Sequence, residues 1–157
     1  MNSKFQIFNA FMLKSLVIIS CISLGFSVFS KCNAQAIVGK WKGVSVKNYF
    51  SSEYSKQVGK TEEEKTVKEA GNSEIEYKPD HTFIMTFSPP NNPEVTTIRG
   101  TWNLTGDQLQ STLEPKYNPQ KKTTNATVSI NGNTMVTTAV IPAPCRICKT
   151  ISTGTKL

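Results

Sequence analysis

The sequence predicts an all-β domain, a small antiparallel sandwich or barrel, that follows an N-terminal export signal. Short runs rich in Val, Ile, Thr and aromatic residues recur along the chain, and Gly, Pro and Asn turns separate them. Regularly spaced short strands with such turns are typical of sandwiches and barrels. The Asn131-Gly132 pair lies between two of these runs and is the strongest short hairpin signal, because both residues tolerate positive φ. Frequent threonine suits a pleated, half-buried surface better than a helix.

The N-terminal segment has the three parts of a secretory signal. Lys4 and Lys14 precede an apolar run over residues 15–29, and small residues follow it. The run of about 15 residues is shorter than the roughly 20 that a membrane-spanning helix needs. We therefore expect a signal helix rather than a retained anchor.

Processing of this signal defines the working domain. We expect a signal segment over residues 1–34, cleavage near Ala34 or Ala36, and a domain over residues 37–157. The Ile-Ile-Ser-Cys segment that ends at Cys21 resembles a bacterial lipobox, which offers lipid attachment as an alternative. With or without a lipid, we expect an exported protein that is periplasmic, secreted or associated with the outer membrane. We expect it to contact a membrane only through its signal or a lipid anchor at Cys21.

The charge of the mature chain argues against nucleic acid as a partner. The whole chain carries a net charge of +7, but Lys4, Lys14 and Lys31 leave with the signal. The 18 basic residues fall to 15 against 11 acidic residues, so the mature domain is only +4. No basic cluster alternates with aromatic residues, and such a cluster is what nucleic-acid binding requires.

Cysteine usage predicts a local disulfide and no metal site. Cys21 and Cys32 belong to the signal, which leaves Cys145 and Cys148 in a C-x-x-C spacing. A closed zinc site needs four ligands, and the chain has one histidine and no second cysteine pair. Redox catalysis needs the first cysteine at a helix start, whereas prolines flank this pair. In an oxidising compartment the two thiols form a short disulfide or stay reduced.

The sequence offers no catalytic constellation. His81 stands alone in a predicted turn, although general acid–base catalysis needs a group held beside a substrate. Residues 62–64 are three consecutive glutamates, and adjacent residues on a helix do not converge on a metal. We therefore expect a protein that is not an enzyme and has no cofactor.

The first half of the domain predicts three strands. Residues 37–46 open the domain, and residues 75–78 and 82–87 flank a turn. Pro79 presets the backbone angle of that turn, and Asp80 can bond its own backbone. A period of two places three apolar side chains of the third run on one face: Phe83, Met85 and Phe87.

The second half predicts five further strands. Residues 95–104 and 108–113 flank the Gly106-Asp107 turn, residues 123–130 and 134–141 flank the Asn-Gly turn, and residues 150–156 form the last strand. The first of these runs places three apolar side chains on one face, with Gly100 between them: Ile98, Trp102 and Leu104.

The segment over residues 49–73 differs from the rest because it is acidic and has few apolar residues. Thr61 and the glutamates after it could cap and start a short helix that ends at Gly71, or the segment is a solvated loop. Its length exceeds that of ordinary connections, so we expect either a lid or binding loop or a surface insertion.

The residues in this order resemble a known family. Gly39-Lys40-Trp41 matches the Gly-x-Trp motif of the lipocalin and wider calycin group. The segments over residues 77–83, 100–109 and 128–135 follow in the order seen in small secreted bacterial lipocalin-like domains. The resemblance covers residues 37–141.

The resemblance implies an up-and-down antiparallel β-barrel of about eight strands. Gly39 and Trp41 are its structural motif, and the tryptophan of this motif packs across the closed end of the barrel. A basic residue from the last strands often stacks on that ring, and here Arg146 or Lys149 is the candidate. Strand alternation would put Trp41 on the face opposite Val44 and Val46 unless a bend intervenes.

A barrel of this size holds either side chains or one small ligand. The resemblance therefore predicts that a small apolar or amphipathic ligand binds in the barrel, and the candidate lining comes from the inward faces: Phe83, Met85, Phe87, Ile98, Trp102, Leu104 and Met135. The alternative is a solid barrel, a structural or interaction module that binds a protein partner through the loops over residues 48–73 and 88–93.

Overall fold

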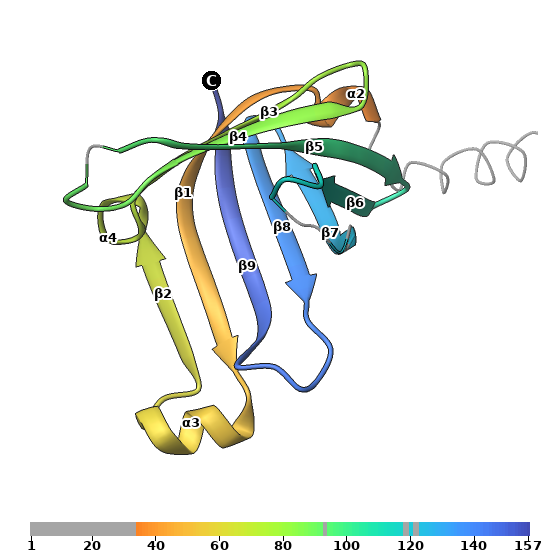
Figure 1. Cartoon of the computed structure of the whole chain (residues 1–157). Coiled ribbons are helices and arrows are strands. Elements are labelled where there is room, and N and C mark those ends of the chain that lie inside the picture. The colour runs from red at the N-terminus through yellow and green to blue at the C-terminus, as the bar shows by residue number, and fades with distance from the viewer. Residues whose placement is uncertain (1–33, 93, 118–119, 121–122) are drawn as a thin grey trace, which may run out of the picture. The chain divides into compact units, whose positions relative to one another are not determined.

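An antiparallel β-barrel is formed by the residues that the computed structural model describes, which are 34–92, 94–117, 120 and 123–157 (Figure 1). Eight of the nine strands in these residues close the barrel: β1 (Gly39–Phe50), β3 (Asn72–Tyr77), β4 (Thr82–Ser88), β5 (Thr96–Thr105), β6 (Gln108–Leu113), β7 (Thr123–Asn131), β8 (Thr134–Val140) and β9 (Ile147–Lys156). The predicted signal helix, Cys21 and Cys32 lie outside the described residues.

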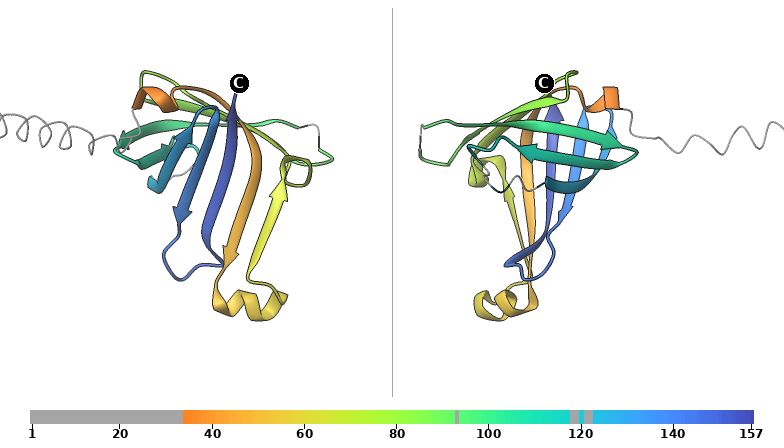
Figure 2. Two further views of the ribbon diagram at one scale, coloured as in Figure 1. Left: turned by 180° about the vertical axis from the view of Figure 1, so that it is seen from behind. Right: turned by 45° about the vertical axis from the view of Figure 1, so that its right-hand side comes forward.

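The strands follow one another as a meander. From β3 to β9 each strand pairs antiparallel with the next, and β1 pairs with both β3 and β9. The pairing of β1 with β9 closes the sheet, so none of these eight strands is left at an edge. Figure 2 shows the two walls of the barrel, in which β4 and β5 cross over β1 and β9 at a steep angle. The predicted up-and-down barrel of about eight strands is confirmed.

Residues 62–66 of the acidic segment form a strand, where we predicted either a helix or a loop. β2 (Glu62–Thr66) pairs with residues 45–49 of β1, while β3 pairs with residues 39–42 of the same strand. Ion pairs across the two strands support the pairing, since Lys47 Nζ lies 3.2 Å from the carboxylate of Glu62 and 3.8 Å from that of Glu64. The expectation of a helix that starts at Thr61 is wrong for these residues, because cross-strand partners favour the extended form.

Two short helices flank β2. α3 (Ser52–Val58) begins at Ser51, whose hydroxyl accepts the Tyr54 N–H at 3.2 Å, and ends at Gly59 with φ of 70°. α4 (Val67–Ala70) ends before Gly71, where we expected a helix to end. The Glu69 carboxylate accepts the N–H and hydroxyl of Thr66 at 2.9 and 3.0 Å, which satisfies a free donor of the first turn. α4 therefore interrupts what would otherwise be one continuous strand.

The closed end of the barrel contains the packed core. α2 (Ala34–Ile37) precedes β1, and Ile37 is fully buried. The Trp41 indole is also buried and donates its Nε1–H to the Ile37 carbonyl at 2.7 Å. The other buried side chains come from six different strands: Tyr77, Phe83, Trp102, Leu109, Val128 and Met135.

The turns follow the chemistry that the sequence predicted. Asp80 accepts hydrogen bonds from the Thr82 N–H at 3.0 Å and from the Thr82 hydroxyl at 2.6 Å. Positive φ occurs at His81, Gly106 and Gly132. The predicted strand positions are confirmed, and their ends differ from the observed bounds by a few residues.

A bulge in β1 supplies the bend that the first strand needed. Gly43 pairs with Gly154, but the next pair is Ser45 with Thr153, so Val44 is the extra residue. One extra residue reverses the alternation of a strand. Val46 therefore faces the same way as Trp41, toward the barrel interior.

None of the helices in residues 34–92, 94–117, 120 and 123–157 is long and apolar enough to cross a membrane.

Candidate ligand-binding pocket

A pocket of about 260 Å³ lies inside the barrel where β1 changes partner from β3 to β2. Residues 42–46 of β1 and the α4 residues Val67 and Ala70 line it at this junction. Its apolar wall comes from side chains on the inward faces of four strands: Trp41, Val46, Ile75, Met85 and Met135. The pocket therefore begins where the packed core of the closed end stops.

Two glycines that lie side by side on adjacent strands leave this space open. Gly43 and Gly154 are direct partners in the β1–β9 register and both line the pocket. A Cβ added to Gly154 would lie 3.8 Å from Trp41 Cβ and 3.3 Å from the Lys42 carbonyl oxygen. A Cβ added to Gly43 would meet the Ser73 hydroxyl. Side chains at these positions would fill the barrel, so the glycine pair keeps it hollow.

Hydroxyl groups form the polar part of the lining. Ser152 and Thr137 are direct partners in the β9–β8 register, and Ser152 is also the partner of Val46 in β1. Ser73 reaches the pocket from β3. Among the side-chain hydrogen bonds between described residues, none involves these three hydroxyls, and no side-chain N or O atom there is both fully buried and unpaired. They are available to a ligand.

The charged residues of the lining lie on the outward face. Lys42 and Glu74 are cross-strand partners. Lys42 follows the inward residue Trp41, and Glu74 precedes the inward residue Ile75. Successive residues of a strand point to opposite faces, so these two side chains point to the outside of the barrel, next to each other on adjacent strands. In the described lining, the inward side chains are uncharged.

The tyrosine between the pocket and the core is strongly desolvated. Tyr77 is 5% exposed and makes an edge-to-face contact with Trp102 at 5.7 Å between ring centres. Burial raises the pKa of Tyr77, because the phenolate would lose its hydration. The residue stays neutral and adds one more uncharged surface to the pocket.

The structure divides the sequence-predicted lining between pocket and core. Met85 and Met135 line the pocket. Phe83 and Trp102 are buried in the core, and Leu104 packs against it. Ile98 is half-buried opposite Met85, and Phe87 is 36% exposed at the end of β4.

The basic group on the motif tryptophan is Lys156, and the expectation of Arg146 or Lys149 is wrong. Lys156 Nζ lies 5.3 Å from the centre of the Trp41 ring. The β1–β9 register decides this, because it makes Lys156 the direct partner of Trp41. Arg146 lies over Tyr54 at 4.9 Å, and Lys149 lies over Tyr49 at 5.1 Å.

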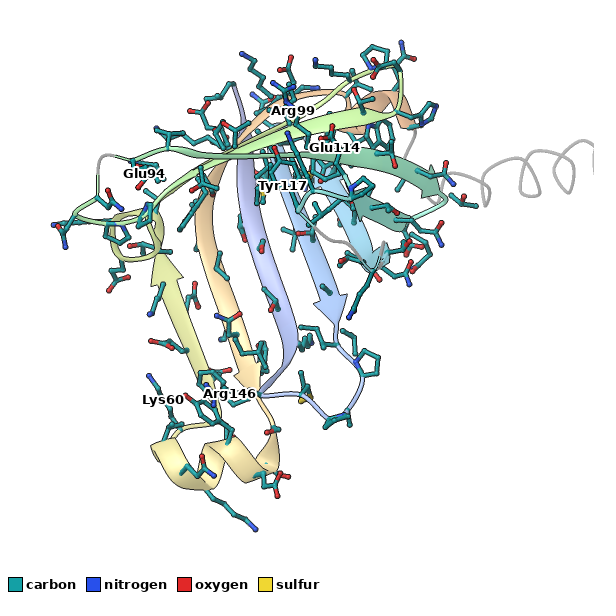
Figure 3. All side chains as sticks on the ribbon, viewed as in Figure 1. Lys60, Glu94, Arg99, Glu114, Tyr117 and Arg146 are labelled. Carbon is teal, nitrogen blue, oxygen red and sulfur yellow. A yellow bond between two sulfur atoms is a disulfide. The ribbon has the colours of Figure 1, made fainter. Side chains whose placement is uncertain are left out.

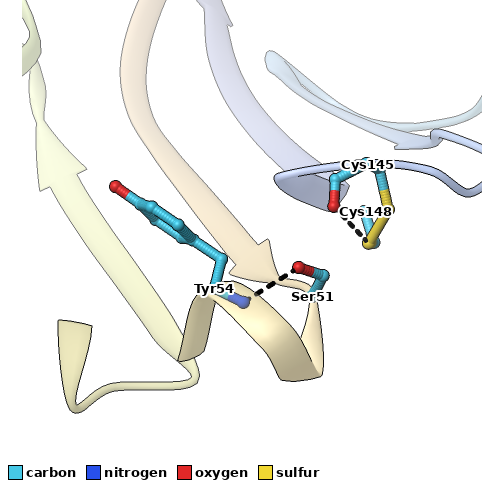
Figure 4. The surroundings of a disulfide bond; sticks show 4 residues. All are labelled: Ser51, Tyr54, Cys145 and Cys148. Atoms are coloured by element: carbon cyan, nitrogen blue, oxygen red, sulfur yellow. Dashed lines mark hydrogen bonds between the residues drawn. A yellow bond between two sulfur atoms is a disulfide. The ribbon is translucent and has the colours of Figure 1, made fainter. Parts of the chain in front are cut away.

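The far end of the barrel carries the predicted disulfide. Cys145 and Cys148 are bonded, with their Cα atoms 5.4 Å apart, beside the start of α3 (Figure 4). The Ser51 N–H donates to the Arg146 carbonyl at 3.0 Å, which joins this loop to α3. Figure 3 shows Arg146 at this end and Arg99 at the other.

The described residues contain no group of three or more His, Cys, Asp or Glu side chains that could hold a metal ion. His81 is exposed in its turn, with its ring centre 4.9 Å from that of Trp102. The described lining of the pocket contains no histidine.

A family model described as a lipocalin-like domain matches residues 37–137. The chain belongs to the lipocalin-like family. Members of this family are generally non-catalytic binding proteins. The chain is also similar to the crystal structure of the wild-type fluorescent protein UnaG, with 14% identity and a TM-score of 0.40 over 78% of this chain and 98% of that one. No curated protein matches the chain in sequence.

The sequence analysis did not identify the glycines and hydroxyl residues that line this lipocalin-like pocket. Gly43, Gly154, Thr137 and Ser152 look like ordinary strand residues in the sequence. The two glycines carry a signal, because a glycine inside a strand often marks a bulge or a close approach. Their mutual pairing is visible only in the register.

Proposed function

We propose that this protein is an exported, non-enzymatic binding protein that holds a small apolar or amphipathic molecule in its barrel. The observation that carries the proposal is the pocket that Gly43 and Gly154 leave open on one wall of the barrel, beside a packed core. Water-excluding concave sites with apolar walls and a few polar groups are typical of small-molecule binding.

The alternative is an interaction module that acts through residues 48–73 and 88–93. α3 has no buried residue, and β2 pairs with β1 alone in the described residues, so this region projects from the barrel. However, β2 carries three glutamates and a lysine, and charged side chains on an edge strand discourage pairing with another chain. The pocket is therefore the better-supported site.

A binding experiment separates the two functions. The protein is produced from its full sequence, and its tryptophan emission is followed while 2-naphthol, an uncharged naphthalene dye, is added. Of the two tryptophans in the chain, Trp41 lines the pocket and Trp102 lies in the core, so a change in emission reports on Trp41. We expect saturable binding.

A matched pair of variants assigns the binding to the pocket. Thr137→Phe adds a ring to the inward lining, and Thr138→Phe adds the same ring to the next residue, which faces outward. We expect only the first to abolish dye binding. No binding to a cooperatively folded wild-type protein would favour the interaction module instead.

We also propose export, which the signal-like sequence of residues 1–34 supports. Ile37 belongs to the buried core, so cleavage after Ala34 or Ala36 leaves the barrel complete. Mass spectrometry of the protein recovered from a bacterial host should find a product that begins at Gln35 or Ile37. A lipid-modified product that begins at Cys21 would establish the anchored form, and a product that keeps Met1 would contradict export.

A further inference from the structure

We propose that the ligand is a small uncharged molecule with one hydrogen-bonding group, which meets the hydroxyls of Ser152 and Thr137, while its apolar part packs on Trp41, Met85 and Met135. This inference rests on the proposed function and specifies its ligand class. It follows from the size of the pocket, its charge and the register of its hydroxyls.

The volume of the pocket sets the size of the ligand. A dry cavity of ~150 Å³ holds benzene, so a pocket of about 260 Å³ holds roughly ten non-hydrogen atoms by proportion. A long-chain fatty acid has about twice that number. The pocket therefore suits a single substituted ring or a short chain.

The inward lining sets the charge of the ligand. Lys42 and Glu74, the charged residues of the described lining, are cross-strand partners at outward positions of β1 and β3. Lys156 lies over Trp41 but is not part of the lining. A carboxylate inside the pocket would lose its hydration without a cationic partner, which is a large penalty. The pocket therefore discriminates against anions.

The register sets the polar contact. Directly opposed residues of an antiparallel pair have Cβ atoms about 5 Å apart, so the hydroxyls of Ser152 and Thr137 can bond one group between them. Val46 and Gly154 adjoin Ser152 on the inward face, and Met135 adjoins Thr137. The two hydroxyls are thus a polar spot in an apolar wall, which fixes the orientation of a bound molecule.

Three ligands test this class: propylbenzene, 4-propylphenol and 4-propylbenzoate, which share a propyl-substituted ring and carry no polar group, a neutral hydroxyl or a negatively charged carboxylate, respectively. Isothermal titration calorimetry at pH 7 measures each against the protein made from its full sequence. We expect 4-propylphenol to bind about five- to tenfold more tightly than propylbenzene, because one buried hydrogen bond increases affinity by about this factor. We expect 4-propylbenzoate to bind at least about a hundredfold more weakly than the phenol.

Thr137→Val and Ser152→Ala remove the hydroxyls with little change in shape. Each should lower the affinity for 4-propylphenol about five- to tenfold and leave propylbenzene unchanged. Thr138→Val, on the outward face of the same strand, is the control and should change neither affinity. Thermal unfolding of every variant verifies that the barrel is folded.

The outcomes distinguish the inference from the proposed function. If 2-naphthol binds and the benzoate binds as tightly as the phenol, the inference is wrong and the binding function stands. The same holds if Thr137→Val and Ser152→Ala weaken propylbenzene and 4-propylphenol equally, because the hydroxyls then contribute only to packing. If neither the dye nor any of the three ligands binds the folded protein, both are wrong.

Discussion

The ammonium group of Lys156 lies 5.3 Å from the centre of the Trp41 ring. These two residues are the first cross-strand pair of β1 and β9, the strands that close the barrel. A cation over an indole contributes about 0.5–1 kcal/mol at an exposed site and more when it is desolvated. The two residues therefore do more than fill space, since their contact favours the register in which β1 meets β9.

Lys156→Met should lower the free energy of unfolding by about 0.5–1 kcal/mol, because it keeps the aliphatic stem over Trp41 and removes the charge. Urea denaturation measures the loss. Lys156→Arg retains a cation over the ring and should stay close to wild type. Equal losses in both variants would mean that the charge contributes nothing.

Gly100→Ala should destabilise the barrel by about 1–3 kcal/mol through overpacking. A Cβ at this position would lie 2.7 Å from Phe83 Cε1 and would also meet the Thr112 carbonyl oxygen, so a core ring and a backbone group would have to shift. Chemical denaturation gives the loss. Gly106→Asn is the control, because its turn has open space and asparagine tolerates the φ of 63°.

Stability should fall in acid through the Asp80 turn. Hydrogen bonds from the Thr82 hydroxyl and N–H hold the pKa of the Asp80 carboxyl below its ordinary value of 3.8. Because the folded pKa is the lower one, the unfolded chain takes up this proton first as the pH falls. The contribution is therefore complete above the ordinary value and is lost as the pH falls through the folded one.

NMR titration of the Asp80 carboxyl checks this directly, with Thr82→Val as the control. Removal of the hydroxyl should move the pKa back toward 3.8. Asp80→Asn should flatten the acid limb of the unfolding free energy. An unchanged acid limb would show that other carboxylates dominate it.

Replacement of both cysteines by serine should cost at most about 2 kcal/mol, because the closed loop is short and restricts the unfolded chain little. Cys145 and Cys148 are only three positions apart in the sequence. The hydrogen bond from Ser51 to the Arg146 carbonyl continues to hold the loop on α3 in this variant. Loss of cooperative unfolding would contradict this expectation and assign the disulfide a larger role.

Much of the fold could be predicted from local chemistry. The turns at Asp80, Gly106 and Gly132 depend on a few neighbouring residues, and the alternation of Phe83 and Met85 is a property of one strand. The segment over residues 62–66 could not be predicted in this way. Its three glutamates would suit a helix start, and the segment is a strand because it pairs with residues 45–49 of β1, where Lys47 meets Glu62 and Glu64.

By itself, the sequence of this protein determined the all-β class, the order and approximate limits of the strands, and the motif tryptophan at the start. The tertiary structure decided which inward residues fill the barrel and which surround a space. The reason is that a hollow depends on register: Gly43 meets Gly154 only once the first strand is paired with the last, and Thr137 meets Ser152 only in the register that joins β8 to β9. Local patterns place a residue on a face, and long-range pairing decides what it faces.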